Sequence, residues 1–212
     1  MEKTCIQVAS KVGIISTISL FISILVFGIS LLIKEANMLS YISSIFIAPS
    51  FLIVFICLYY CVSENKKLWL HIGIVFGVIY SVYAMLNYYI QATVIRLNDF
   101  GTPNNILQLF TFKPRSILFA QDMLGYTFLC LATLVSAPAF NADKSEKILK
   151  WFFIIHVMMF IIPLSFPAIS FKGDESGYII QILANLFWCV VFIPITFLIY
   201  IYFNKKSKMA NS

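Results

Sequence analysis

Long apolar stretches without charge constrain the fold of this chain more than any other feature. Six of them, each 20 to 27 residues long, hold only one of the 24 charged residues, Asp122. They cover residues 12–33, 41–62, 69–95, 116–138, 151–170 and 178–203. About 20 apolar residues in a helix cross the roughly 30 Å core of a bilayer, and a helix satisfies its own backbone hydrogen bonds there. The sequence therefore predicts an all-α, polytopic membrane protein, a bundle of six transmembrane helices.

The composition excludes an ordinary soluble enzyme. Hydrophobic residues make up 61% of the 212 residues and charged residues 11%, whereas soluble domains are about half apolar and about a quarter charged. The continuous apolar runs also differ from the alternating segments of a β-barrel. The longest segment between predicted spans, residues 96–115, has 20 residues, which is too short for a separate soluble domain. We therefore expect residues 1–212 to form a single transmembrane domain.

The positive charges predict the orientation of the bundle. Alternate connecting segments, beginning with the N-terminus, carry ten lysines: Lys3, Lys11, Lys66, Lys67, Lys144, Lys147, Lys150, Lys205, Lys206 and Lys208. The opposite side carries five basic residues: Lys34, Arg96, Lys113, Arg115 and Lys172. Because cytoplasmic loops are enriched in basic residues, we expect an N-in/C-in membrane protein with both termini in the cytoplasm. The net charge of +6 then serves topology, so the expected partner is the lipid bilayer and no nucleic acid.

Polar residues inside the predicted spans gather at one depth. Asp122 is the clearest of them, because an ionisable group within a span is costly and commonly functional. Counting residues along the helices places eight side chains in the outer half of the bundle: Asn87, Gln91, Arg96, Arg115, Gln121, Asp122, Gln181 and Asn185. Tyr126 lies one turn from Asp122 on the same helical face. These nine residues are the candidate ligand-binding residues.

Both arginines border the same outer loop, although 13 of the 15 basic residues are lysines. An arginine guanidinium is a planar fork suited to a carboxylate or a phosphate. One interpretation is an internal salt bridge from Arg96 or Arg115 to Asp122 or Asp99. The other is an anionic ligand or a lipid headgroup. The two interpretations are compatible, because a paired site can still open to a ligand.

Other sequence features favour packing over chemistry. Gly73 and Gly77 form a GxxxG pattern, which we interpret as helix contact within one chain, with a homo-oligomer contact as the alternative. The five cysteines and two histidines lack metal-ligand spacing, and His156 is expected to be a hydrogen-bonded histidine. No catalytic motif is present. The sequence predicts no metal site and no cofactor.

Segment 87–94 reads N-Y-Y-I-Q-A-T-V and segment 124–126 reads L-G-Y. The chain thereby resembles a group of uncharacterised bacterial six-span integral membrane proteins with the pattern N-Y-[FY]-x-Q-x-T-V in span three. In that group an acidic residue precedes L-G-Y, where this chain has Asp122. The chain departs from the group before span four, where Lys113-Pro114-Arg115 replaces Asn-Pro-His. The resemblance implies the six-span fold and the site, and it implies no reaction.

Three functions follow from these observations. The first is a small-molecule or lipid binding, transport-related or accessory protein with its site at the outer polar residues. The second is a membrane-embedded enzyme that acts on a lipid or amphiphile and uses Asp122 as a general acid or base. The third is a structural or partner-binding protein whose polar groups only hold helices together. The absence of a recognisable catalytic motif leaves enzyme activity undecided and favours the first function.

Overall fold

The computed structural model describes residues 2–33, 37–97, 110, 116–159 and 174–211. Within these residues every regular element is helical, which confirms the all-α prediction. The long helices are α1 (Glu2–Ser30), α2 (Asn37–Cys61), α3 (Lys67–Ile90), α5 (Ile117–Ser136), α6 (Lys144–His156) and α8 (Asp174–Asn211). Three short elements are the 3-10 helices η1 (Glu64–Lys66) and η3 (Ala137–Ala139) and the π-helix η2 (Gln91–Ile95).

Within the part of the chain that the structure describes, five helical segments are long and apolar enough to cross a membrane. They lie in α1, α2, α3 with its flanking turns, α5 with η3, and α8. The helices extend beyond several of the predicted spans: α1 begins at Glu2 and α8 ends at Asn211. Apolar length marks the part of a helix that suits lipid, while the helix itself continues until a breaker residue or a lost hydrogen bond ends it. The predicted span 151–170 begins inside α6, and its second half lies outside the described residues.

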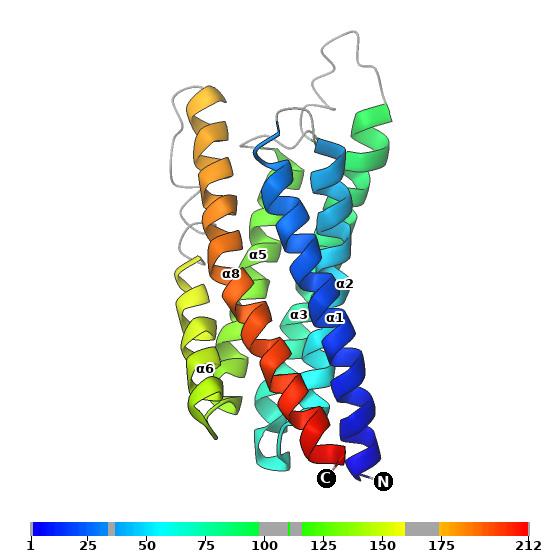
Figure 1. The fold of residues 1–212 in the computed structure, drawn as a ribbon. Coiled ribbons are helices and arrows are strands. Elements are labelled where there is room, and N and C mark those ends of the chain that lie inside the picture. Colours follow the sequence, from blue (N-terminus) through cyan, green and yellow to red (C-terminus); the bar gives the residue numbers. More distant parts are fainter. Residues whose placement is uncertain (1, 34–36, 98–109, 111–115, 160–173, 212) are drawn as a thin grey trace.

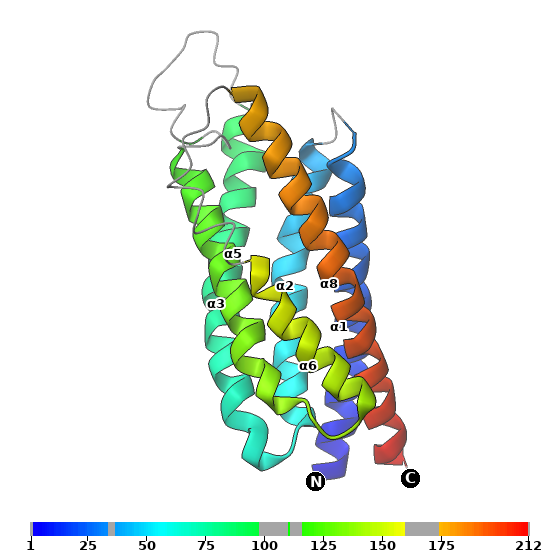
Figure 2. The same cartoon turned by 90° about the vertical axis from the view of Figure 1, so that its left-hand side faces the viewer.

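The helices form a closed ring in which neighbours in sequence are neighbours in space. Figures 1 and 2 show α1 beside α2, α2 beside α3, and α3 beside α5. α6 packs against α5 and α8, and α8 packs against α1, which closes the ring. Both termini lie at the same end of the bundle (Figure 1), where Gln7 Nε2 donates to Asn211 Oδ1 at 2.8 Å.

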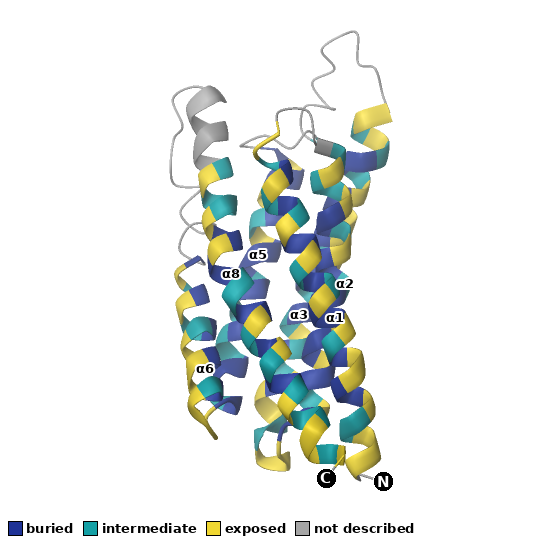
Figure 3. Ribbon diagram, in the orientation of Figure 1, coloured by how far each residue is buried: buried dark blue, intermediate teal, exposed yellow. Residues whose placement is uncertain are grey.

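α1 has one face toward the interior of the bundle and one face that is exposed. Ser16 and Ser23 are buried, and Ser19 shares a hydrogen bond of 2.9 Å with Ser50 of α2. The opposite face carries large apolar side chains that are exposed, such as Ile15 at 69% and Ile22 at 53%. Figure 3 shows the same alternation of exposed and buried residues along α1 and α6. The inward face of α1 therefore combines small polar residues with the fully buried Leu20 and Ile24, while its other face exposes apolar side chains.

Aromatic rings fill the middle of the ring of helices. Phe51 of α2 lies 6.2 Å from Phe192 of α8, and Phe55 stacks on Phe153 of α6 at 6.0 Å between ring centroids. Trp188 of α8 packs at 5.1 Å on Phe192. The first two contacts join helices that are not neighbours around the ring, so the interior is a packed core along this part of the bundle.

The GxxxG glycines lie inside the chain, as expected for packing within the monomer. A Cβ atom at Gly73 would lie 2.1 Å from Ser136 Oγ and 3.0 Å from the Ala132 carbonyl oxygen of α5. A Cβ atom at Gly77 would lie 3.2 Å from the Phe51 ring of α2. Both glycines are buried against neighbouring helices of the same chain.

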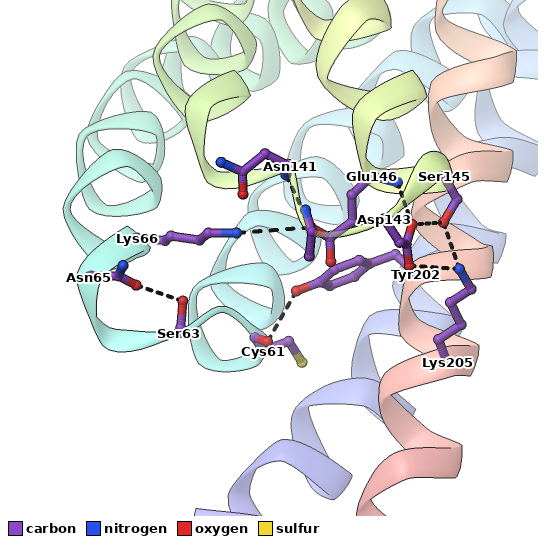
Figure 4. A network of polar contacts seen from close by, with 11 residues as sticks. Cys61, Ser63, Asn65, Lys66, Asn141, Asp143, Ser145, Glu146, Tyr202 and Lys205 are labelled. Carbon is purple, nitrogen blue, oxygen red and sulfur yellow. Dashed lines mark hydrogen bonds and ion pairs between the residues drawn. The ribbon is translucent and has the colours of Figure 1, made fainter.

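A polar network joins three segments at the end of the bundle that carries the termini (Figure 4). Asp143 caps α6 by accepting the Glu146 N–H at 2.9 Å, and Lys205 Nζ of α8 lies 2.9 Å from its carboxylate. The Glu146 N–H, followed by Lys205, holds the pKa of the Asp143 carboxyl well below its usual range. Tyr202 donates to the Cys61 carbonyl at 3.1 Å. The network fixes where α6 begins relative to α2 and α8.

Candidate functional site

Asp122 is buried between α3 and α5, with 3% of its surface exposed. Asn87 Nδ2 donates to Asp122 Oδ1 at 2.9 Å, and the Tyr88 hydroxyl donates to Oδ2 at 3.4 Å. The Tyr88 hydroxyl also lies 3.4 Å from that of Tyr126. We call Asn87, Tyr88, Asp122 and Tyr126 the Asp122 cluster. All four side chains come from two helices that meet at this depth.

The opposite directions of α3 and α5 bring these residues together. Asn87 lies 20 residues past Lys67, which is about 30 Å along α3 from the end with the termini. Asp122 lies near the first turn of α5, where Ser116 caps the helix by accepting the Phe119 N–H at 3.1 Å. Gly125 permits the close approach, since a Cβ atom there would lie 3.2 Å from Tyr83 Cβ. The cluster thus lies in the half of the bundle away from the termini.

Acceptor atoms outnumber donors in the cluster. Asn87 is fully buried, and its Oδ1 has no hydrogen-bond partner. Ser44 of α2 is also buried, and its hydroxyl lies beside that of Tyr88. Buried polar atoms without a partner are rare, because each costs about 1–3 kcal/mol. The Asn87 Oδ1, beside a buried carboxyl group, indicates an arrangement that is incomplete as it stands.

Irregular helix lies directly beyond the cluster. Residues Gln91–Ile95 form the π-helix η2, and the Gln91 N–H is shared between the Asn87 and Tyr88 carbonyls. Single π-turns occur frequently at functional sites. The Gln91 side chain is buried and donates to the Phe110 carbonyl at 2.9 Å. Gln91 therefore ties the end of α3 to Phe110, and its side chain does not face Asp122.

The remaining predicted site residues are more scattered. Arg96 is exposed, and within the described part of the chain it forms no ion pair with Asp122. Gln121 and Asn185 are half-buried. Arg115 and Asp99 lie outside the described residues, and so does the side chain of Gln181, whose backbone lies in α8. Of the nine candidates, the structure brings together Asn87, Asp122 and Tyr126, and it adds Tyr88.

A second buried polar group surrounds His156, which is completely buried. The Trp188 indole donates to His156 Nε2 at 3.1 Å, and His156 Nδ1 lies 2.8 Å from Thr133 Oγ1. An indole only donates, so Nε2 is the acceptor and the proton of the neutral ring lies on Nδ1. The Thr133 hydroxyl oxygen accepts a hydrogen bond from this N–H, and the hydroxyl donates to the Cys130 carbonyl at 2.9 Å. His156 is therefore hydrogen-bonded, as expected, and both of its nitrogens are satisfied.

The two polar groups meet at Trp188. Its ring lies 5.6 Å from the Tyr126 ring, edge to face, while its indole N–H points to His156. The sequence did not single out Tyr88, Thr133 or Trp188. The sequence did hold one signal for Tyr88. A buried tyrosine hydroxyl generally needs a polar partner, and Tyr88 directly follows the polar Asn87 inside a predicted span. Within the described residues, no group of three His, Cys, Asp or Glu side chains could hold a metal ion.

Comparison with known proteins finds no matching family model, no matching curated protein and no matching solved structure. The resemblance to the six-span group therefore stays a prediction. The function has to be argued from the geometry of the Asp122 cluster.

Proposed function

We propose that the chain is a multi-pass protein of the bacterial cytoplasmic membrane, with six spans and both termini in the cytoplasm. Exposed apolar faces such as that of α1 suit lipid, because water-soluble proteins rarely expose large contiguous apolar patches. Termini at one end of the bundle are consistent with an even number of crossings. The lysines Lys66 and Lys205 lie at that same end and favour its placement in the cytoplasm.

Reporter fusions test this topology. Fusions at Ser212 and at Asn65 should report the cytoplasm, and a fusion at Asn104 should report the outside, because the bulk of the lysines lies on the first side. The chain should also stay with the membrane during alkaline extraction. A Ser212 fusion that reports the outside would overturn the orientation, and extraction into the soluble fraction would overturn the membrane assignment.

We further propose that the protein binds a small polar ligand or a lipid headgroup at the Asp122 cluster, in a transport-related or accessory role. The observation that carries this proposal is a buried carboxyl group with neutral partners beside the unpartnered Oδ1 of the fully buried Asn87. A set of groups that served only to hold helices together would be fully hydrogen-bonded, as the His156 group is. Binding sites commonly retain such unfavourable groups at a cost in stability.

An enzymatic role receives less support from the geometry. Among the described residues, the buried Thr133 hydroxyl and His156 imidazole most resemble a catalytic pair of nucleophile and base. The Nδ1 proton points toward Thr133, so the ring cannot take a proton from that hydroxyl in this arrangement. Asp122 would have to act alone as acid or base.

The Asp122→Asn variant separates binding from helix association without knowledge of the ligand. Asparagine keeps the shape while removing the charge: its Oδ1 can accept from Asn87 Nδ2, and its Nδ2 can donate to the Tyr88 hydroxyl oxygen. If the cluster is a binding site, the unfolding midpoint of the variant in detergent, with choline as the only added cation, should equal or exceed that of the unaltered protein. Thr133→Val is the matched control, because it breaks a fully satisfied buried group and should lower the midpoint. An Asp122→Asn midpoint as low as that of Thr133→Val would contradict the binding proposal.

A further inference from the structure

We propose that the Asp122 cluster takes a singly charged cation, either a proton or an alkali metal ion, and not an anion. This inference rests on the proposed binding function and specifies its ligand class. It departs from the arginine pattern of the sequence, which suggested a carboxylate or phosphate. The sign of the charge follows from the atoms that surround the site.

Oxygen atoms from several helices face the site. Asp122 presents two carboxylate oxygens, Asn87 presents an unpartnered Oδ1, and the Ser44 hydroxyl of α2 lies beside that of Tyr88. Three helices thus contribute oxygen atoms. An anion would face this surface with like charge, whereas a proton or a hard cation is bound by oxygen ligands of these kinds.

Asp122 has no positively charged partner among the described residues. The titratable groups that face it are Tyr80 and Tyr88 from α3 and Tyr126 from α5, with Cys130 beside Tyr80 and Tyr41 of α2 behind Tyr88. α8 contributes the neutral Trp188, which separates the cluster from His156. Within the described part of the chain, no lysine, arginine or histidine lies within ion-pair distance of Asp122. A buried carboxylate needs a compensating positive charge, and here the described residues do not supply one.

The hydrogen bonds around Asp122 are long enough to change length when a small ligand binds. The Tyr88 hydroxyl lies 3.4 Å from both Asp122 Oδ2 and the Tyr126 hydroxyl, whereas O–H···O bonds are usually 2.7–2.8 Å long. These long contacts can shorten or open around a small occupant. The burial of Asn87 and Asp122 favours an ion over a bulky headgroup. The π-helix η2 adds irregular backbone at this depth, a feature of ion sites in membrane helices.

The experiment measures the unfolding midpoint of the purified full chain in detergent. One series varies NaCl at constant ionic strength against choline chloride, and a second varies pH in choline chloride. A bound alkali ion should raise the midpoint with Na⁺, by roughly 5–10 °C at about a hundredfold excess over Kd. A proton site should instead raise the midpoint as pH falls and be indifferent to Na⁺. Asp122→Asn should abolish whichever response the unaltered protein shows.

The controls keep the outcomes distinct. Asp143→Asn removes a carboxylate at the other end of the bundle and should leave the Na⁺ response unchanged. If the protein carrying Asp122 and the Asp122→Asn variant respond identically to Na⁺ and to pH, the cation proposal is wrong. Stabilisation by phosphate or acetate that disappears in Asp122→Asn would also overturn it, while leaving the binding site itself intact. A large loss of stability in Asp122→Asn would instead contradict the proposed function.

Discussion

Trp188 Nε1 donates to His156 Nε2 at 3.1 Å and thereby sets the tautomer of a histidine that has no access to solvent. The bond joins α8 to α6, and Thr133 extends it to α5. Three helices therefore share one chain of hydrogen bonds in the interior of the bundle.

Trp188→Phe should destabilise the protein by about 1–3 kcal/mol, the cost of leaving one buried ring nitrogen without a partner. Switching the tautomer does not help, because either nitrogen needs a partner. The measurement is the unfolding midpoint in detergent. Trp151→Phe is the control, since Trp151 is 61% exposed and its replacement should change the midpoint little. Equal midpoints for both variants would show that the bond to His156 contributes nothing.

Gly73→Ala should lower stability by about 1–3 kcal/mol through overpacking, because the new methyl group would collide with Ser136 Oγ and the Ala132 carbonyl. Gly28→Ala is the matched control. Its nearest contact is Cys189 Sγ at 3.4 Å, so the higher helix propensity of alanine should keep or raise the midpoint. Ser136→Ala should cost little alone, since Ser136 Oγ has no hydrogen-bond partner, and should partly rescue Gly73→Ala. No rescue would mean that the backbone contact to Ala132 dominates.

Asp143→Ala should cost about 1 kcal/mol at neutral pH, because it removes the cap of α6 and the ion pair with Lys205. The pKa of Asp143 is lower in the folded protein than in the unfolded chain, so its contribution is present above about pH 4 and is lost as pH falls below that. The gap between the two midpoints should therefore be constant near neutrality and narrow in acid. Asp143→Asn keeps a capping side chain and should cost less, since exposed ion pairs contribute little.

Arg96→Ala should change the unfolding free energy by no more than about 0.5 kcal/mol, as for other exposed positions without partners. It should also leave the Na⁺ and pH responses of the Asp122 cluster unchanged. A variant that lost those responses would show that Arg96 reaches the cluster in solution.

Thiol labelling checks the burial of the bundle. Cys5 is exposed, whereas Cys57, Cys61, Cys130 and Cys189 are buried. A maleimide should therefore label one thiol in the folded chain and four more after unfolding, and Cys5→Ser should remove the fast reaction. Rapid labelling of several thiols in the native protein would contradict the packed interior.

The sequence pattern predicted the depth of a residue along its own helix, but it did not predict which side chains of two helices would meet. Counting residues placed Asn87 and Asp122 at one depth, because rise per residue is fixed, and the structure brings the two side chains into contact. Counting does not fix how each helix is rotated relative to its neighbours. Tyr88 therefore went unrecognised as a partner of Asp122, and Gln91 bonds to Phe110 instead of joining the cluster.

The packing of α1 against α8 has a consequence for how the chain assembles. These are the first and last long helices, so α1 leaves the ribosome well before its neighbour exists. Gly13 of α1 receives the ring of Phe203, where a Cβ atom would lie 2.5 Å from the aromatic carbons. The space beside Gly13 has no occupant until Phe203 has been synthesised, so the ring closes only after the helices from α1 to α6 have been made. Chains that stop short of Phe203 should therefore remain open along one seam and become substrates for membrane quality control.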